Sequence, residues 1–291
     1  MRTSDEIKKL ITDKAISDSR IRAVLLKGSR ANPHVAPDNF QDFDVVYIVT
    51  EIESFVSDHT WTHIFGDILI RQFPDEMEVG KEAGVEENVG FSYLMLFKDG
   101  NRIDLTLFPK DKLETDFQID SLTIVWLDKD NIFVDIEKSS DKDYLIKRPS
   151  ERAFLECCNE FWWTTTNVAK GISRNEIPYA KEMLETVVRP MFMKIVEWQI
   201  GADTDFLVSF GKGGKFMSRH LSTQLYYKIL ATYSDHQAEN NWKSLFVMTG
   251  LFGPFARTIA GKLNFPYNLE EEQNAISYLN QCYAQYKVIH T

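Results

Sequence analysis

The chain has 291 residues, of which 44% are hydrophobic and 26% are charged, proportions typical of a folded globular protein rather than a disordered one. This length excludes a small disulfide-stapled protein and fits one large domain or two ordinary ones. The 33 basic and 43 acidic residues leave a net charge of −10, which argues against a general nucleic-acid-binding protein and favours a cationic partner.

The N-terminal residues and the cysteines favour a cytoplasmic location. Residues 1–15 alternate charged and apolar side chains and lack the apolar centre of a secretory signal. The most apolar stretch, residues 245–256, is broken by glycine and proline and is too short to span a bilayer. Cys157, Cys158 and Cys282 have no metal-ligand spacing and suit a reducing compartment. We therefore expect a cytoplasmic protein with free thiols and no membrane contact.

The first half of the chain changes its hydrophobic period often, which predicts a mixture of helices and strands. A capping-box pattern, Thr-Ser-Asp-Glu at residues 3–6, begins a helix that should end near Ser17. Apolar and alternating runs predict strands at residues 22–27, 42–50, 91–98, 102–108 and 122–127. The Asp99-Gly100 pair indicates a hairpin turn between two of these strands. The acidic residues 75–88 predict a long surface loop.

From Ser150 onward the apolar residues fall almost continuously at helical spacing. The predicted helices cover residues 150–171, 175–200, 223–232, 239–263 and 270–287, and Pro190 should kink the second of them. The change of pattern at Arg148-Pro149 predicts a domain boundary. We therefore expect an α+β protein. Its N-terminal domain, residues 1–148, should hold a mixed β-sheet with flanking helices, and its C-terminal domain, residues 149–291, should be an α-helical bundle.

Gly28-Ser29-Arg30 directly follows the first predicted strand. A glycine at this point lets the backbone approach a ligand closely, and the following N–H groups and the Ser29 hydroxyl can turn toward phosphate oxygens. The segment therefore predicts a cradle for an anion. For the tripeptide taken alone, an ordinary chain turn is the alternative.

Three aspartates supply the second part of the predicted site. Asp42 and Asp44 are two residues apart in a predicted strand, so their side chains share one face at a spacing of about 6.6 Å. Asp104 lies in a strictly alternating strand and shares a face with Arg102 and Thr106. If the two strands are neighbours, three carboxylates converge, and Mg²⁺ usually binds through carboxylates together with substrate phosphates. The arrangement predicts nucleotidyl transfer, whereas solvated strand surface is the alternative for the first pair alone.

Gly28-Ser29, the Asp42-x-Asp44 pair and the later Asp104 resemble the pattern of the DNA polymerase β-like nucleotidyltransferase superfamily. More closely, the whole chain resembles the aminoglycoside 6-adenylyltransferases, also called streptomycin adenylyltransferases. The segments that carry this closer resemblance span both predicted domains, at residues 28–30, 39–44, 101–109, 147–149, 157–162, 170–171, 174–176, 211–212 and 242–246.

The resemblance implies an ATP-dependent enzyme that transfers AMP to the 6-hydroxyl of streptomycin, releases pyrophosphate and so inactivates the antibiotic. It further implies that Asp42 and Asp44 bind two magnesium ions and that Gly28-Ser29-Arg30 holds the triphosphate. Asp104 is then either the third metal ligand or the base that takes the proton of the hydroxyl group.

Four residues of the helical half are candidates for substrate contacts. Lys170 and Arg174 are four residues apart near a helix end and are expected to contact the triphosphate, with compensation of the helix-terminal charge as the alternative. Glu160 and Trp163 are expected to bind the cationic antibiotic through a carboxylate and an aromatic wall. Tryptophan packing beside a solvated glutamate is the alternative.

We expect a monomer whose partners are ATP and the aminoglycoside, without nucleic acid. Two other functions fit the same pattern of residues. A nucleotidyltransferase of the same chemistry would act on another hydroxylated acceptor, such as a different antibiotic or a protein side chain. A nucleotide-sensing protein would retain the fold without turnover, although the intact set of Asp42, Asp44 and Asp104 argues against it.

Overall fold

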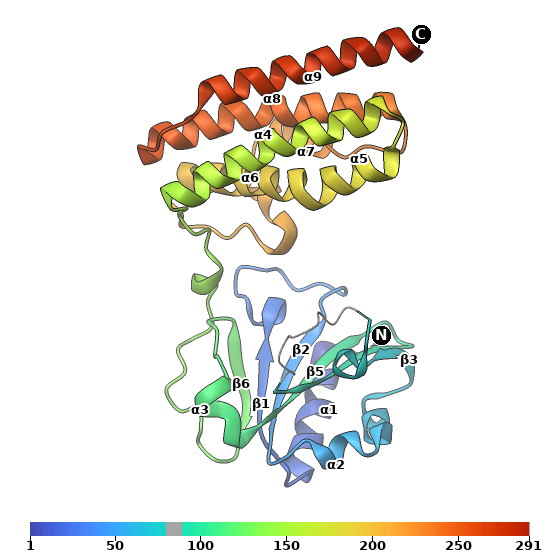
Figure 1. Ribbon diagram of the computed structural model, residues 1–291. Coiled ribbons are helices and arrows are strands. Elements are labelled where there is room, and N and C mark those ends of the chain that lie inside the picture. The colour runs from blue at the N-terminus through green and yellow to red at the C-terminus, as the bar shows by residue number, and fades with distance from the viewer. Residues whose placement is uncertain (80–88, 291) are drawn as a thin grey trace. The chain divides into compact units, whose positions relative to one another are not determined.

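The structure is a computed structural model that describes residues 1–79 and 89–290 (Figure 1). The chain forms two compact units, Met1–Asp143 and Tyr144–Thr291, and each has its own hydrophobic core. The first unit combines a mixed sheet with short and long helices, whereas the second is helical. The predicted α+β class is therefore confirmed.

Within the described residues, the first unit is built on one sheet of six strands, in the order β3-β4-β5-β2-β1-β6. The strands are β1 (Ile21–Lys27), β2 (Phe43–Val49), β3 (Ile68–Gln72), β4 (Phe91–Phe97), β5 (Arg102–Pro109) and β6 (Thr123–Asp128). β2 and β5 run parallel, and the other neighbouring pairs are antiparallel. Five of these strands match the predicted ones. The edge strand β3 was not predicted, because its side chains are mostly exposed and lack an alternating pattern.

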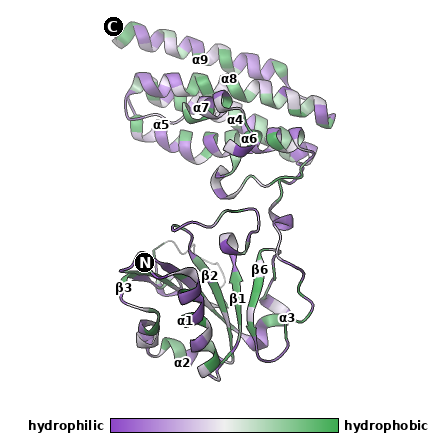
Figure 2. Cartoon of the chain, turned by 180° about the vertical axis from the view of Figure 1, so that it is seen from behind, coloured by the Kyte–Doolittle hydropathy of each residue, from purple (hydrophilic) through white to green (hydrophobic). Residues whose placement is uncertain are grey.

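Side chains of the sheet build a core on each of its faces. The helices of this unit are α1 (Ser4–Ser17), α2 (Glu53–Val56) and α3 (Leu113–Asp116). α1 and α2 pack on the face that holds Phe43 and Val45, whereas α3 packs on a smaller core that holds Val46 and Ile48. β1 and β2 are apolar on both faces and are largely green in Figure 2, as expected for the interior of a sheet.

The second unit packs its helices around a shared aromatic core. The helices are α4 (Glu151–Ser173), α5 (Ile177–Met183), α6 (Arg189–Asp203), α7 (Thr223–Leu230), α8 (Ala238–Leu263) and α9 (Leu269–His290). The buried rings of Phe161 and Phe252 stack at 3.6 Å between their centroids and join α4 to α8. None of the helices in the described part of the chain is long and apolar enough to cross a membrane.

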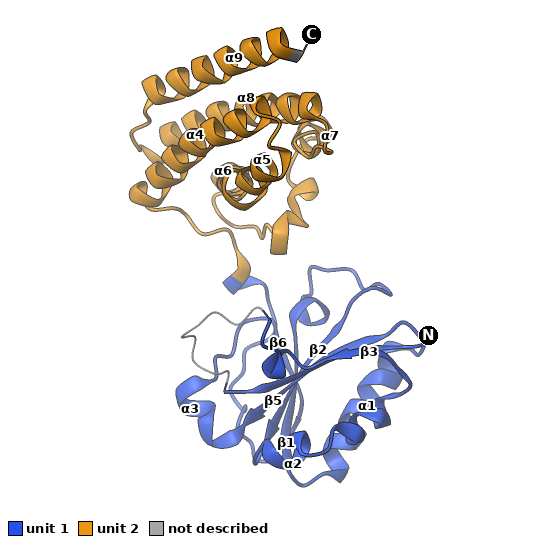
Figure 3. Ribbon diagram, turned by 45° about the vertical axis from the view of Figure 1, so that its right-hand side comes forward, with its two compact units in different colours: residues 1–143 blue, residues 144–291 orange. Residues whose placement is uncertain are grey.

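The division between the units falls a few residues before the predicted boundary at Pro149 (Figure 3). The connecting segment already pairs with the second unit, since Leu145 forms a bridge with Ser209 and the Ile146 N–H donates to the Val208 carbonyl at 2.9 Å. The start of α4 agrees with its sequence signal, because the Ser150 hydroxyl accepts the Ala153 N–H at 3.1 Å. The function assigned to each domain stays a prediction.

Two predicted segments differ in detail from the structure. Residues 175–200, predicted as one kinked helix, form α5, a π-helical turn at Leu184–Val188 and α6. Pro190 lies just after this turn, at the start of α6, and the Arg189 N–H before it donates to the Leu184 carbonyl. The helix therefore accommodates the missing N–H of proline next to a π-helical turn. Of the predicted loop at residues 75–88, residues 80–88 lie outside the described residues.

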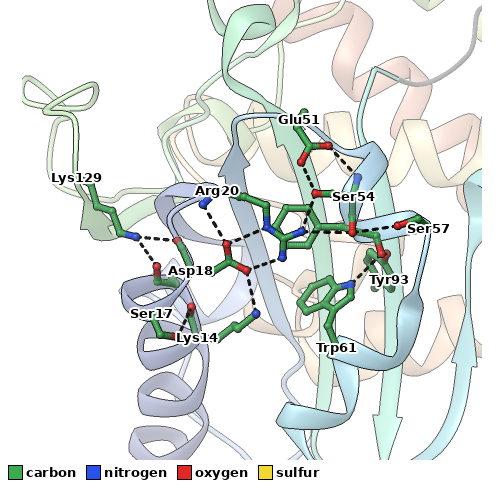
Figure 4. Close-up of polar contacts among 12 residues, drawn as sticks. Lys14, Ser17, Asp18, Arg20, Glu51, Ser54, Ser57, Trp61, Tyr93 and Lys129 are labelled. Carbon is green, nitrogen blue, oxygen red and sulfur yellow. Dashed lines mark hydrogen bonds and ion pairs between the residues drawn. The ribbon is translucent and has the colours of Figure 1, made fainter.

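A polar network around Asp18 joins the C-terminal end of α1 to the sheet (Figure 4). The Asp18 carboxylate accepts hydrogen bonds from the Arg20 side chain, at 2.7 and 3.0 Å, and from Lys14 at 3.0 Å. Lys129, just after β6, donates to the backbone carbonyls of Ala15 and Asp18 at 2.6 and 3.0 Å. The Arg20 guanidinium, with help from Lys14, holds the pKa of the Asp18 carboxyl well below its usual range.

We expect Asp18→Asn to lower the free energy of unfolding at pH 7 by about 2 kcal/mol, because it leaves two partly buried cations without their carboxylate. The folded state lowers the pKa of Asp18, so the ionised carboxylate stabilises the protein above about pH 4, and this contribution is lost as the pH falls below that value. The difference between variant and wild type should therefore shrink from pH 7 to pH 3. Urea denaturation at the two pH values measures it.

The control is Asp13→Asn, which removes an exposed carboxylate of the same helix that pairs with Lys9. This variant should match wild type at both pH values. A difference between Asp18→Asn and wild type that stays constant between pH 7 and pH 3 would contradict the electrostatic role of Asp18.

Candidate active site

The predicted site residues of the first unit meet where strand β1 ends and strands β2 and β5 begin. β1 runs antiparallel to β2, so the last residue of β1, Lys27, lies opposite Asp44. β2 runs parallel to β5, and Asp44 lies opposite Asp104 in that pairing. The end of β1 and the starts of β2 and β5 therefore bring Gly28, Asp44 and Asp104 together, as the sequence predicts for neighbouring strands.

The strand pattern places the carboxylates on one face. Phe43 and Val45 are buried against α1, and Asp44 between them points to the opposite face. On β5, Ile103 and Leu105 are buried in the same core, so Asp104 also points away from it. The smaller core on that second face begins with later residues of the strands, which leaves the aspartates partly accessible.

Gly28 is in direct contact with the carboxylate of Asp44. Its φ is +70°, a value that favours glycine, and it begins the short 3₁₀ turn Gly28–Ala31. A Cβ added at Gly28 would lie 2.2 Å from the Asp44 Oδ2. The turn therefore requires glycine twice, for its backbone angle and for the close approach to Asp44.

Arg30 is tied to the segment that precedes β2. Its guanidinium donates to the backbone carbonyls of Asp42 at 3.1 Å and Gln41 at 2.8 Å, and it lies 3.7 Å from the centre of the Phe43 ring. Its partial burial lowers the pKa of the Arg30 side chain, with the nearby carboxylates opposing this effect. In this structure Arg30 fixes the position of Asp42. Its predicted contact with a triphosphate stays a prediction.

Arg102 is a member of the site to which the sequence pattern assigned no role. Its Nε and Nη2 atoms donate to the two carboxylate oxygens of Asp104 at 2.7 and 2.8 Å, and its Nε lies 3.8 Å from the Asp42 Oδ2. The signal for this contact was present in the sequence, because opposite charges two residues apart in a strand share a face. The guanidinium thus bridges two of the three aspartates.

The charges and the partial burial of the site shift the pKa values of Asp42 and Arg102. Burial raises the pKa of Asp42, and the nearby Asp104 charge adds to this effect, whereas Arg102 and Arg30 oppose it. The hydrogen bonds from Arg102 to Asp104 raise the pKa of Arg102. The edge of the sheet therefore holds several interacting charges in a small, partly dehydrated region.

The donor chemistry of this edge fits a divalent cation, although the side chains are not arranged as a finished metal site. Asp44 and Asp104 face the same side of neighbouring strands, and Asp42, which immediately precedes β2, lies close to Arg102. Hard cations such as Mg²⁺ prefer oxygen ligands of this kind. Because Gly28 has no side chain, the Asp44 carboxylate can lie against the turn that follows β1. Within residues 1–79 and 89–290, no group of three or more His, Cys, Asp or Glu side chains is positioned to hold a metal ion. Both oxygens of Asp104 are instead hydrogen-bonded to Arg102.

The candidates of the second unit lie along one side of α4 and at its C-terminal cap, which is Arg174. At 100° per residue, Glu160, Trp163, Lys170 and Arg174 fall on the side opposite the buried residues of this helix. Glu160 accepts a hydrogen bond from the Thr164 hydroxyl at 3.3 Å and is exposed.

Trp163 lines a cavity that Glu160 does not reach. This exposed ring and Tyr278 are among the walls of a cavity of about 360 Å³ between α4 and α9, which also includes Glu270 and Glu271. Trp162, in contrast, is buried and donates its indole N–H to the Tyr267 hydroxyl at 3.2 Å. The two adjacent tryptophans therefore differ, since Trp162 packs in the core and Trp163 is available at the surface.

Comparison with known proteins shows the family of the chain. A family model described as streptomycin adenylyltransferase matches residues 1–282. The chain is 41% identical over 268 residues to an aminoglycoside 6-adenylyltransferase of Bacillus subtilis (strain 168), covering 92% of this chain and 93% of the relative. It is 40% identical over 273 residues to an aminoglycoside 6-adenylyltransferase of Campylobacter jejuni, covering 94% and 93%.

A solved structure is also similar in sequence. The crystal structure of an aminoglycoside 6-adenyltransferase from Bacillus subtilis is 36% identical, covers 97% of this chain and 99% of its own, and superposes with a TM-score of 0.46. The resemblance inferred from the motifs is confirmed by the family model and by relatives that match along nearly their full length. The chain belongs to the streptomycin adenylyltransferase family.

Proposed function

We propose that this protein is an ATP-dependent enzyme that transfers AMP to the 6-hydroxyl of streptomycin and thereby inactivates the antibiotic. The family match over residues 1–282 supports the reaction and the acceptor. The observation that carries the proposal is the pairing of Asp44 with Asp104 across β2 and β5, with Gly28 against Asp44. This arrangement gives the reaction the convergent carboxylates that phosphoryl-transfer chemistry needs.

The reaction joins the antibiotic to the α-phosphorus of ATP. A bond forms between the hydroxyl oxygen and that phosphorus, the bond to the bridging oxygen breaks, and pyrophosphate leaves with its electron pair. The backbone N–H groups of the Gly28–Ala31 turn, the Ser29 hydroxyl and Arg30 orient the triphosphate. Asp104 either takes the proton of the attacking hydroxyl or completes the set of metal ligands.

In this proposal Asp42 and Asp44 hold two magnesium ions. When bound, such ions neutralise the charge of the phosphates and of the leaving pyrophosphate. The contribution of this chain is to keep the two carboxylates in place. Phe43, buried between them, anchors the strand, and Arg30 fixes the Asp42 backbone.

The helical unit is proposed to bind the rest of both substrates. Lys170 and Arg174 are assigned to the triphosphate, and Glu160 and Trp163 to the cationic antibiotic. The exposed Trp163 ring supports the latter assignment. We propose that the enzyme acts as a monomer in the cytoplasm, where ATP is available.

The direct test is mass analysis of streptomycin after incubation with the protein, ATP and Mg²⁺. The proposal expects the antibiotic to gain the mass of one adenylyl group, together with release of one pyrophosphate. A panel of other hydroxylated acceptors and labelled ATP should run in parallel. Label on another acceptor or on protein, and never on streptomycin, would assign a different substrate. The absence of pyrophosphate with every acceptor would favour a nucleotide-sensing protein.

Asp42→Asn and Asp44→Asn should each reduce adenylyl transfer by at least about 100-fold, because each removes a metal-binding charge. The fold should remain largely intact, because asparagine keeps the size of each side chain and the carboxylates of the site repel one another. Pyrophosphate release and circular dichroism measure the two effects. The control is Asp130→Asn, which removes a carboxylate of the same unit that is paired with Arg22 and Lys110. Turnover close to wild type in either site variant contradicts the metal-binding role.

Gly28→Ala should reduce transfer strongly, because the added methyl group would displace the Asp44 carboxylate. The matched control is Gly213→Ala. Gly213 has a φ of +64°, and a Cβ there would meet no atom within 4 Å, so alanine would add only the backbone strain of about 1–2 kcal/mol. Steady-state turnover and thermal unfolding of both variants measure the difference. If both alanine variants keep the same activity, the close contact between Gly28 and Asp44 has no functional role.

A further inference from the structure

Arg102 forms an ion pair with Asp104, one of the three aspartates to which the proposed reaction assigns a role. Its guanidinium donates two parallel hydrogen bonds to Asp104, one to each carboxylate oxygen, at 2.7 and 2.8 Å. The same Nε atom lies 3.8 Å from the Asp42 Oδ2. A single cation therefore lies between carboxylates that would otherwise repel each other.

The two partners of this ion pair are not equally free to move. Arg102 has 43% of its side-chain surface exposed, compared with 20% for Asp104. Asp104 is fixed on β5 between the buried Ile103 and Leu105, and it lies opposite Asp44 on β2. The arginine side chain has several rotatable bonds and open solvent beside it, so Arg102 is the partner that can leave.

The ion pair also limits what Asp104 can do. A carboxylate has two oxygens, and the planar fork of the guanidinium engages both of them. These two hydrogen bonds use about two of the four lone-pair sites of the carboxylate, so a metal ion at Asp104 would have to share the carboxylate with a positively charged guanidinium. The positive charge of Arg102 therefore opposes the binding of a cation at Asp104.

We propose that Arg102 is an internal counter-ion of Asp104 that competes with a divalent cation for this carboxylate and is displaced when the cation binds. This inference rests on the proposed function, since it assumes that the aspartates bind metal. Arg102 is a positioning residue in this role. It lies between Asp104 and Asp42 before the substrates arrive, and it competes with the cation for Asp104.

The test measures binding of Mn²⁺ alone to the full-length protein, without ATP or antibiotic, by the loss of the electron paramagnetic resonance signal of free Mn²⁺. Arg102→Gln removes the competing charge and should tighten Mn²⁺ binding by about three- to tenfold. Arg102→Lys keeps the charge without the fork and should lie between Gln and wild type. Circular dichroism confirms that each variant is folded.

Two controls separate competition at Asp104 from a general loss of positive charge. Arg22→Gln breaks another arginine–aspartate pair of the same unit, in which Nε lies 2.9 Å from the Asp130 Oδ2, and should bind Mn²⁺ as wild type does. In an Asp104→Asn background, Arg102→Gln should no longer tighten binding. This double-mutant comparison isolates the coupling between the two side chains.

Equal Mn²⁺ affinity of wild type and Arg102→Gln would overturn the inference while leaving the proposed function intact. An Arg102→Gln effect that persists in the Asp104→Asn background would also overturn it, because the arginine would then act only through its long-range charge. If none of the variants binds Mn²⁺, the inference fails together with the metal-binding part of the proposed function. In that case, adenylyl transfer to streptomycin, measured separately by mass, decides whether the reaction itself stands.

Discussion

The parallel pairing of β2 with β5 is the constraint on which the candidate site depends. It places Asp44 directly opposite Asp104, although the two residues are sixty positions apart in the sequence. A shift of this register by one residue would turn one aspartate toward the buried face, because neighbouring side chains of a strand point to opposite sides. The buried Phe43, Val45, Ile103 and Leu105 prevent such a shift, since each would lose its place in the core. Hydrophobic packing on one face thus fixes the chemistry of the other.

Most of the elements could be predicted from sequence because their signals are local. The capping box before α1, the Ser150 cap of α4 and the alternation along β5 all depend on residues a few positions apart. The edge strand β3 could not be found in this way, because exposed side chains on both faces leave no periodic pattern. The π-helical turn at Leu184–Val188 was also missed. Nothing in its composition distinguishes it from an α-helix that contains a proline shortly afterwards.

The sequence was enough to name the residues of the candidate site, but not the contacts between them. Gly28, Asp42, Asp44 and Asp104 could be named from residue type and spacing, because the chemistry of phosphate transfer restricts which side chains can serve. The sequence could not show that the Cβ of any other residue at Gly28 would meet the Asp44 carboxylate at 2.2 Å. Such a contact depends on how closely the turn after β1 approaches the start of β2, and a short sequence pattern does not contain this distance.

The two arginines of the site, Arg30 and Arg102, differ in how far they are buried and in which groups accept their hydrogen bonds. Arg30 is partly buried against the Phe43 ring and donates to uncharged backbone carbonyls, so a metal ion bound by the carboxylates would not compete for its partners. Arg102 is more exposed and donates to a carboxylate, which is the group that a divalent cation also seeks. The first contact can therefore persist through a catalytic cycle as part of the scaffold. The second contact is the one that we propose is exchanged, because a divalent cation would compete for the same carboxylate.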